Sequence, residues 1–341
     1  MATATYKLYK LHFTSPLHIA DNHEDESNSL KTIQSDTLYA ALMSCLAKTG
    51  NTIPDNGNLG FTISSLFPYY QRGKDNNPIY FLPMPMQACI SELSDVSMAK
   101  KVKSIQWVDV ALYSSLLSGK SFFDGTDEYY PCIQASYLTC QTLPEDTNGS
   151  KEFIKSEVSQ RVTLKSRTGE EDAKPYYVDK VLFKYDSGLY FLAVGNTNLL
   201  EEALCLLSIE GLGTDRNVGF GFFDYSVDNL TLELPDDANH QVSLSLFIPE
   251  SKEQLNEMLA SNDVAYDFAR RGGWITTYPY NTLRKNAIYG FMPGSVFSLK
   301  EGQICAPMGR IVNLRPEIGE LTPDHPIWRN GKAIMLPVKL K

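Results

Sequence analysis

Residues 211–221 read Gly-Leu-Gly-Thr-Asp-Arg-Asn-Val-Gly-Phe-Gly and combine the residue types of an anion-binding loop. Glycine permits backbone conformations with positive φ and lets another molecule approach the chain closely. Successive backbone N–H groups in such a loop can surround an anion, and an embedded arginine is a fork-shaped cation suited to phosphate. The alternative is a structural helix-to-strand turn in which the first glycine ends the helix. The candidate binding residues are Gly211, Gly213, Arg216, Asn217, Gly219 and Gly221.

The position of this glycine-rich loop excludes two nucleotide-binding motifs. A Walker-type phosphate loop contains Gly-Lys followed by Ser or Thr, and a dinucleotide fingerprint opens a helix after a strand. Here the glycines follow a predicted helix over 199–208 and precede a predicted strand over 222–227. The pattern Asn198-x-x-Glu201 predicts a capping box at the start of that helix. On its own, the segment indicates an anion-binding turn.

The remaining reactive residue types do not form a recognisable catalytic or metal centre. The six cysteines are scattered without a Cys-x-x-Cys pair, which indicates buried free thiols rather than zinc ligands or disulfides. We interpret the carboxylates of residues 21–26 as a solvated acidic loop. General acid–base catalysis needs a positioned base and usually a second group, and His18 has no recognisable partner. We therefore expect no metal, no cofactor and a surface position for His18.

Hydrophobic periodicity predicts the elements that position these residues. Ser35 or Asp36 is expected to be the N-cap of a helix over 37–48. Arg270 and Arg271 are expected to end a helix that begins at residue 251, because the dipole at a helix C-terminus favours cations. Residues 161–165 and 176–183 are expected to form a long, exposed β-hairpin with a polar tip over 167–174. The pattern further predicts strands over 6–13, 188–194, 222–227, 241–247 and 333–338, and helices near 107–117, over 37–48, over 199–208 and from 251 to about 270.

The order of these predicted elements indicates an α+β fold. Each half follows the strand–helix–strand pattern of the ferredoxin-like plan, which RNA-recognition domains also use. We expect a first ferredoxin-like domain over 1–234, with a protruding hairpin inserted at about 160–184, and a second over 241–341. The short polar segment 235–240 would link them.

The charge distribution matters more than the total charge. The net charge is −9, but it is −5 over 1–150, +2 over 151–185, −12 over 186–265 and +6 over 266–341. Screening limits the reach of a charge to about 8 Å in physiological salt, so local charge decides whether a surface holds phosphate. The hairpin and the C-terminal quarter could therefore hold RNA. No stretch approaches the roughly 18–20 apolar residues that span a bilayer, and no apolar signal core begins the chain, so we expect a cytoplasmic protein.

Four stretches together resemble one family. The glycine-rich loop with the following Phe222-Phe223 looks like the signature loop of the RAMP superfamily of CRISPR RNA-binding proteins, although that loop often has Gly-Gly and Ser before its last glycines. Taken in order, all four stretches are similar to the RAMP subunit that caps the 5′ tag of the guide RNA in type III-A (Csm) effector complexes. The other three are Ser35-Asp-Thr-Leu-Tyr-Ala-Ala-Leu42, Leu66-Phe-Pro68 with Tyr80-Phe-Leu-Pro-Met-Pro85, and Arg270-Arg-Gly-Gly-Trp-Ile275 with Pro293-Gly-Ser-Val-Phe297.

This resemblance implies a non-catalytic subunit that binds the 5′ tag and positions guide and target RNA without cleaving them. It implies as protein partners the large palm-domain subunit and the first backbone RAMP subunit. The hairpin would act as a thumb that enters the guide–target duplex. RNA contacts are then expected at His18, Ser35, Asp36, Thr37, Arg161, Lys165, Arg167, Gly211, Gly213, Arg216, Asn217, Gly219, Gly221, Arg270 and Arg271.

Two alternatives remain open at this point. One is a guide-processing, metal-independent endoribonuclease of the same superfamily, in which His18 would be catalytic. The other is a purely structural adaptor, in which the acidic region 186–265 binds protein and any contact with RNA is incidental.

Overall fold

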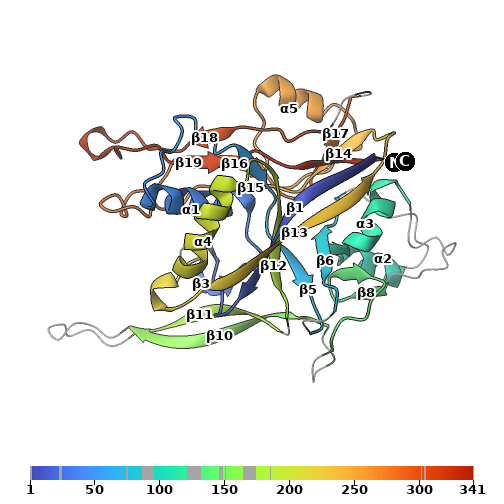
Figure 1. Cartoon of the computed structure of the whole chain (residues 1–341), viewed down its shortest axis with the longest axis horizontal. Helices are drawn as coiled ribbons and strands as arrows, with labels where there is room; N and C mark the ends of the chain where they lie inside the picture. The colour runs from blue at the N-terminus through green and yellow to red at the C-terminus, as the bar shows by residue number, and fades with distance from the viewer. Residues whose placement is uncertain are drawn as a thin grey trace.

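The computed structural model of the chain contains a large central sheet with helices and smaller sheets packed around it (Figure 1). It describes residues 2–22, 25–73, 76–86, 96–120, 132–145, 149, 151–163, 174–184, 186–300, 302 and 305–340. Among these residues, no helix has the length and apolar character needed to cross a membrane.

The central sheet has nine strands, and the order along it is β13–β1–β12–β5–β6–β7–β9–β8, with β4 also paired to β12. The longest strands, β1 and β13, pair antiparallel from Ala2 opposite Leu234 to Phe13 opposite Phe223. The strands are β1 (Ala2–Phe13), β4 (Phe61–Ile63), β5 (Phe67–Tyr70), β6 (Ile79–Pro83), β7 (Trp107–Asp109), β8 (Cys132–Gln134), β9 (Tyr137–Thr139), β12 (Gly188–Gly195) and β13 (Phe223–Leu234).

Both faces of this sheet are covered, and the alternation of side chains along a strand shows how. In β12, Leu189 and Phe191 belong to one core cluster, whereas Tyr190 and Leu192 belong to the other. Successive side chains of a strand point to opposite faces. A strand that is apolar at every position is therefore buried on both sides, as the uninterrupted run 188–194 predicts.

Two helices cover the first face and lie side by side (Figure 1). They are α1 (Ser35–Lys48) and α4 (Asn198–Glu210). Each carries apolar residues at helical spacing, including Leu38, Leu42 and Leu46 in α1, and these residues join the same core cluster as the odd-numbered residues of β1.

The second face is covered by α3 (Val110–Leu117) and by a three-stranded sheet of order β17–β14–β20. Val242 and Leu336 of that small sheet share a core cluster with Leu8 and Leu192 of the large sheet. The N-terminal and C-terminal parts of the chain are thus packed through a common apolar core. The helix α2 (Val96–Lys103) contributes Val102 to the same cluster.

The C-terminal part is built mainly from short strands. Its single α-helix among the described residues, α5 (Lys252–Met258), begins at Ser251, whose hydroxyl accepts a hydrogen bond from the N–H of Gln254. The strands are β14 (His240–Ser243), β15 (Phe268–Arg271), β16 (Ile288–Phe291), β17 (Val296–Ser298), β18 (Ile311–Asn313), β19 (Trp328–Asn330) and β20 (Met335–Val338); β15 pairs with β16, and β18 pairs with β19.

A pair of long antiparallel strands, β10 (Ile154–Thr163) and β11 (Lys174–Phe183), runs along one edge of the molecule (Figure 1). The short pair β2 (Ala20–Asn22) and β3 (Asp25–Ser29) lies next to β11. Two antiparallel strands are paired where the hairpin was predicted, but the pairing begins at Ile154 rather than at residue 161, and residues 167–173 of the predicted tip lie outside the described residues. Residues 14–34, predicted as a loop, include the β2–β3 pair.

The mixed composition of strands and helices confirms the broad α+β prediction, and the helix over 37–48 and the strand over 188–194 are also confirmed. Three details are wrong. Residues 107–109 form β7, and α3 starts only at Val110, because the Asp109 side chain accepts a hydrogen bond from the N–H of Ala111 and caps the helix. Thr197, not Asn198, is the N-cap of α4, and it makes no capping side-chain hydrogen bond.

The third error concerns the last helix, which ends at Met258 and does not reach residue 270. Residues 260–263 read Ala-Ser-Asn-Asp, and short polar side chains of this kind bond to nearby backbone and compete with a helix. Here the Ser261 hydroxyl accepts a hydrogen bond from the N–H of Asp263. Arg270 and Arg271 consequently lie in a strand, β15, and not at a helix end.

Candidate nucleic-acid interface

The glycine-rich loop connects α4 to β13, as predicted, and the fold itself requires most of its glycines. A Cβ atom on Gly213, where φ is +102°, would lie 2.4 Å from the carbonyl oxygen of His18. The same is true of Gly211 and Gly221, whose added Cβ atoms would meet backbone oxygens at 2.7 and 2.0 Å. Only Gly219, with φ of +94°, has nothing within 4 Å of such an atom. Three glycines therefore serve internal packing, and the fourth borders open space.

Residues 14–18, which follow β1, hold the glycine-rich loop in place. The N–H of Gly221 donates to the carbonyl oxygen of Pro16 at 2.8 Å, and the N–H of Thr214 donates to that of His18 at 2.9 Å. The same short segment is also bonded to the hairpin, because Leu17 and Val181 exchange backbone hydrogen bonds at 3.0 and 2.8 Å. The loop and the hairpin are thus fixed to one common piece of chain.

The tip of the loop is a short 3₁₀ turn, Arg216–Val218, that faces solvent. The side chains of Arg216 and Asn217 are exposed, and within the described residues their backbone N–H groups have no acceptor. The Arg161 guanidinium of β10 pairs with the Asp215 carboxylate at 2.8 Å and lies 5.2 Å from the centre of the Phe220 ring. Free N–H groups beside an exposed arginine form a surface that can accept a phosphate.

The structure places His18 in the interior, which corrects the expectation of a surface or RNA-contacting histidine. Only 2% of the residue is exposed, and its Nδ1 lies 2.8 Å from the carbonyl oxygen of Asp179. The residue connects the segment after β1 to the hairpin strand β11. In this position the imidazole is almost fully removed from solvent.

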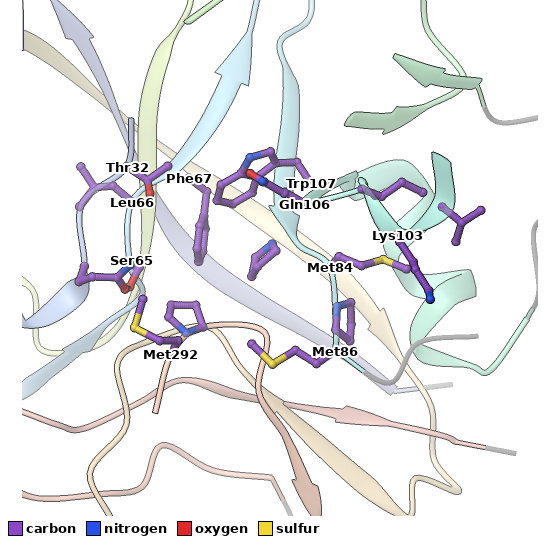
Figure 2. A pocket seen from close by; sticks show the side chains of 16 residues that line it. Thr32, Ser65, Leu66, Phe67, Met84, Met86, Lys103, Gln106, Trp107 and Met292 are labelled. Carbon is purple, nitrogen blue, oxygen red and sulfur yellow. The ribbon is translucent and has the colours of Figure 1, made fainter. Parts of the chain in front are cut away.

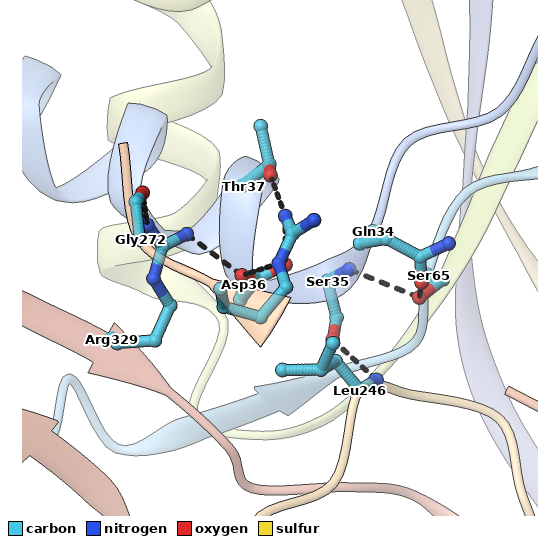
Figure 3. A network of polar contacts seen from close by, with 9 residues as sticks. Gln34, Ser35, Asp36, Thr37, Ser65, Leu246, Gly272 and Arg329 are labelled. Carbon is cyan, nitrogen blue, oxygen red and sulfur yellow. Dashed lines mark hydrogen bonds and ion pairs between the residues drawn. The ribbon is translucent and has the colours of Figure 1, made fainter. Parts of the chain in front are cut away.

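Ser35 and Asp36, at the helix start expected to bind RNA, are buried and bonded to other parts of the chain. Figure 3 shows their partners. Gln34 is the N-cap residue of α1. The Ser35 hydroxyl accepts a hydrogen bond from the N–H of Leu246 at 2.9 Å, and the N–H of Ser35 donates to the Ser65 hydroxyl at 3.0 Å. This serine therefore joins the first helix to the C-terminal part of the chain.

Asp36 is fully buried and is bonded to two arginines from the C-terminal part (Figure 3). Arg271 donates to its carboxylate through Nε at 2.8 Å and Nη2 at 3.1 Å, and Arg329 donates through Nη1 at 2.7 Å. Arg271 also donates a hydrogen bond to the Thr37 hydroxyl at 2.9 Å, and Thr37 is partly buried. A buried carboxylate is tolerated only when it is paired in this way.

Charge at this network is unbalanced toward cations. Burial opposes ionisation of Asp36, but attraction to Arg329 and Arg271 outweighs burial and holds its pKa below the ordinary value. Lys285 lies close by, and burial together with Arg329 and Arg271 lowers its pKa to about 8, against the opposing attraction of Asp36. Three cationic groups thus surround one carboxylate, and the surplus positive potential favours a nearby anion.

The predicted arginine pair divides between two roles. Arg271 points inward to Asp36, whereas its neighbour Arg270 is exposed, because consecutive strand residues face opposite sides. Arg161 lies at the junction of hairpin and loop. Lys165 and Arg167 lie outside the described residues.

One member of the buried network, Arg329, was not predicted from the sequence. Asp36 and Arg329 are 293 residues apart, so no local pattern links them. The sequence offered one signal, Asp36 at a predicted helix start. If this carboxylate is buried, a cationic side chain must pair with it.

A groove of about 440 Å³ lies between α2, the strand ends near Pro83 and the C-terminal part (Figure 2). Aromatic and sulfur-containing side chains line much of it, including Phe67, Trp107, Met84 and Met292. None of the residues predicted to contact RNA lines this groove. The described residues also contain no cluster of three His, Cys, Asp or Glu side chains placed to hold a metal ion.

Comparisons with known proteins agree on one family. The family model of the CRISPR Csm4 C-terminal domain matches residues 236–338. The "CRISPR system Cms protein Csm4" of Mycobacterium tuberculosis (strain ATCC 25618 / H37Rv) is 30% identical over 292 residues, which cover 82% of this chain and 84% of that protein. The protein of the same name from Streptococcus thermophilus is 28% identical over 310 residues, covering 88% of this chain and 91% of that protein.

Solved structures share the fold across the chain. The crystal structure of a Csm3–Csm4 subcomplex in the type III-A CRISPR-Cas interference complex contains a chain with a TM-score of 0.57 and 17% identity, covering 98% of this chain and 100% of that one. A chain of a Csm1–Csm4 cassette in complex with cA4 gives a TM-score of 0.55 at 17% identity, with 99% of each chain covered. With the curated relatives at up to 30% identity over most of the sequence, the comparisons establish that this chain belongs to the Csm4 family.

Proposed function

We propose that this chain is a non-catalytic subunit of a type III-A CRISPR effector complex that binds the 5′ tag of the guide RNA and caps that end of the complex. The observation that carries the proposal is the exposed tip of the glycine-rich loop. It presents Arg216, Asn217 and two unpaired backbone N–H groups to solvent on a backbone that is bonded to the segment 14–18.

The physical mechanism is a fixed set of donors around a single strand. Because residues 14–18 hold the loop, its N–H groups keep their direction when a phosphate binds, and little ordering entropy is lost. The glycine-rich loop lies in the acidic region 186–265, so Arg161 from the hairpin and the basic C-terminal quarter are needed to offset that charge. Affinity is expected to fall as salt rises, because bound phosphate releases counterions.

We infer two ferredoxin-like domains over 1–234 and 241–341, and the sheet order of the first supports this division. In the first, the strand order β13–β1–β12–β5 with α1 and α4 on one face follows the strand–helix–strand–strand–helix–strand plan. The pair β10–β11 would act as the thumb near the guide–target duplex. Its Arg161 connects the thumb to the tag-binding loop, so the two would move as a unit.

Relatives suggest the protein partners. Csm4 chains with this fold have been crystallised with Csm1 and with Csm3. We infer that this chain contacts the large palm-domain subunit and a backbone RAMP subunit in the same way, within a cytoplasmic complex that also holds the target RNA.

Lack of catalysis is supported by the interior position of His18, which removes the candidate general base from the RNA-facing side. Incubation of the purified protein with precursor guide RNA in chelator tests this directly. Intact RNA is expected. Metal-independent cleavage that is lost in His18→Ala would instead establish the endoribonuclease alternative.

The test of tag binding uses the assembled complex and tag RNA. Arg216→Ala combined with Asn217→Ala is expected to weaken binding about 10-fold or more, since hydrogen bonds to a charged group contribute roughly 1.5–3 kcal/mol. The salt dependence should also weaken by about 0.7 in slope for each lost phosphate contact on a single strand. Lys252→Ala, which removes an exposed cation from α5, is the matched control. Unchanged tag affinity in the double variant would favour the protein-adaptor alternative.

A further inference from the structure

The outward face of the β15–β16 pair carries aromatic rings that nothing in the described structure covers. Phe268 is 55% exposed and Tyr289 is 60% exposed, and their ring centroids lie 5.7 Å apart at an interplanar angle of 80°. Large aromatic side chains are normally buried, so two adjacent rings in solvent on a regular pair of strands indicate a surface for binding.

Arg270 lies on the same face. It is two residues from Phe268 along β15 and directly opposite Tyr289 in the ladder. In the part of the chain that the structure describes, its guanidinium is neither hydrogen-bonded nor ion-paired. An exposed arginine beside two exposed rings combines the two groups that bind a nucleotide: planar rings for the base and a cation for the phosphate.

The opposite face anchors this pair of strands. Arg271 points inward and donates three hydrogen bonds to Asp36 and Thr37 at the start of α1. Gly290, opposite Ala269, lies directly against the Leu246 side chain, where a Cβ atom would meet it at 2.8 Å. The exposed rings are therefore held on a rigid support, which reduces the entropy lost when a ligand binds.

The surrounding charge selects RNA over protein as the occupant. Residues 266–341 carry a net charge of +6. Arg284, which is exposed, lies 4.7 Å from the centre of the Trp274 ring. A protein docking site is typically apolar at its centre with few charges, whereas interleaved rings and cations characterise surfaces for single-stranded nucleic acid.

We propose that the outward face of β15–β16 is a base-stacking platform for single-stranded RNA, with bases on Phe268 and Tyr289 and a phosphate at Arg270. The proposal rests on the RNA-binding function proposed above and adds a second contact area on a different element from the glycine-rich loop. Such a platform tolerates any base, because every base has an aromatic face.

The experiment replaces each ring with leucine, which keeps an apolar side chain at the position but cannot stack on a base. Phe268→Leu with Tyr289→Leu, in the assembled complex, is expected to weaken the binding of tag-containing guide RNA at least about 30-fold, the lower end of what two stacked bases provide. Phe268→Tyr with Tyr289→Phe keeps both rings and should restore binding. Tyr278→Leu is the matched control, because Tyr278 is 85% exposed but lies outside the pair of strands.

Three outcomes are decisive. Loss of RNA affinity with leucine and recovery with the exchanged rings supports the platform. Wild-type RNA affinity in the leucine variant overturns it. Loss of neighbouring subunits with alanine at both positions, but not with leucine, at unchanged RNA affinity, also overturns it and assigns the face to protein docking. The Arg216 variant in parallel separates the proposals, because its effect on RNA does not depend on this platform.

Discussion

Replacing Asp36 with asparagine is expected to destabilise the protein strongly. The carboxylate takes three charge-assisted hydrogen bonds from Arg271 and Arg329, at 2.7, 2.8 and 3.1 Å. Asparagine keeps one acceptor oxygen but removes the charge that balances two largely buried guanidinium groups. Breaking a buried ion pair from one side typically costs about 3–5 kcal/mol, mostly because the remaining charge stays buried.

The assay is urea and thermal unfolding of wild type and Asp36→Asn at neutral pH. With an unfolding entropy of about 2.1 cal/mol/K per residue over the chain, this loss lowers Tm by roughly 4–7 °C. Arg270→Met is the matched control, since Arg270 is the exposed neighbour of the buried arginine and should change stability by less than about 0.5 kcal/mol. Replacing all three partners together, with Asp36→Leu, Arg271→Met and Arg329→Met, should cost less than Asp36→Asn alone.

The pH dependence gives an independent check. The pKa of Asp36 is lowered in the folded protein, so its contribution is fully present above the ordinary value of 3.8 and is lost as pH falls through the lower, folded value. The difference in stability between wild type and Asp36→Asn should therefore stay constant from neutral pH down to about 4. An Asp36→Asn variant within about 1 kcal/mol of wild type would refute the assignment of this network as the main polar connection between the two parts of the chain.

Three further predictions concern single positions. Gly213→Ala should lower the free energy of unfolding by about 3 kcal/mol or more, because the added methyl group would meet a backbone oxygen at 2.4 Å. Gly219→Ala has open space but a positive φ, so urea unfolding should show a loss of only about 1–2 kcal/mol. Equal losses in the two variants would contradict the packing role of Gly213. The pKa of Lys285 is about 8 in the folded protein, below its ordinary 10.5, so folding releases its proton between these pH values and the stability of the wild type should rise with pH over that window. Lys285→Met should abolish this part of the rise and increase the free energy of unfolding by up to roughly 3 kcal/mol at pH 7. Parallel stability–pH profiles of the two proteins would count against this prediction. Arg161→Ala should change the free energy of unfolding by no more than about 1 kcal/mol, because the ion pair with Asp215 is partly exposed. The same variant should speed amide hydrogen exchange in β10. Unchanged exchange would show that β10 does not depend on this contact.

Local patterns account for what could be predicted. Strand 188–194 is apolar at every position, and a helix, a glycine-rich turn and a strand follow one another within about 35 residues, so short-range chemistry specifies them. The resemblance to 5′-tag-capping RAMP subunits rested on the order of four such stretches, and membership of the Csm4 family confirms that recognition.

Long-range packing accounts for the errors at the candidate site. A serine and an aspartate before an apolar run predict an exposed cap, and only the approach of residues 246, 271 and 329 converts Ser35 and Asp36 into buried connectors. His18 follows the first strand in a polar context, but the hairpin strand β11, some 160 residues later, covers it. Arg270 and Arg271 point to opposite faces because they lie in a strand. The sequence predicted a helix there, so this arrangement was not expected.

The position of β1 between β13 and β12 has a consequence for how the protein is made. Its two neighbours, β12 and β13, are encoded at residues 188–195 and 223–234, so the first strand leaves the ribosome long before either partner exists. At about 5–20 residues per second, that interval is on the order of tens of seconds. During it, a partly apolar strand with two unpaired edges is exposed to other nascent chains. The same delay applies to the segment 14–18, so the glycine-rich loop takes shape only when synthesis has passed residue 221. Expression conditions that slow translation, or that limit chaperones, should therefore reduce the yield of soluble subunit more than its final stability suggests.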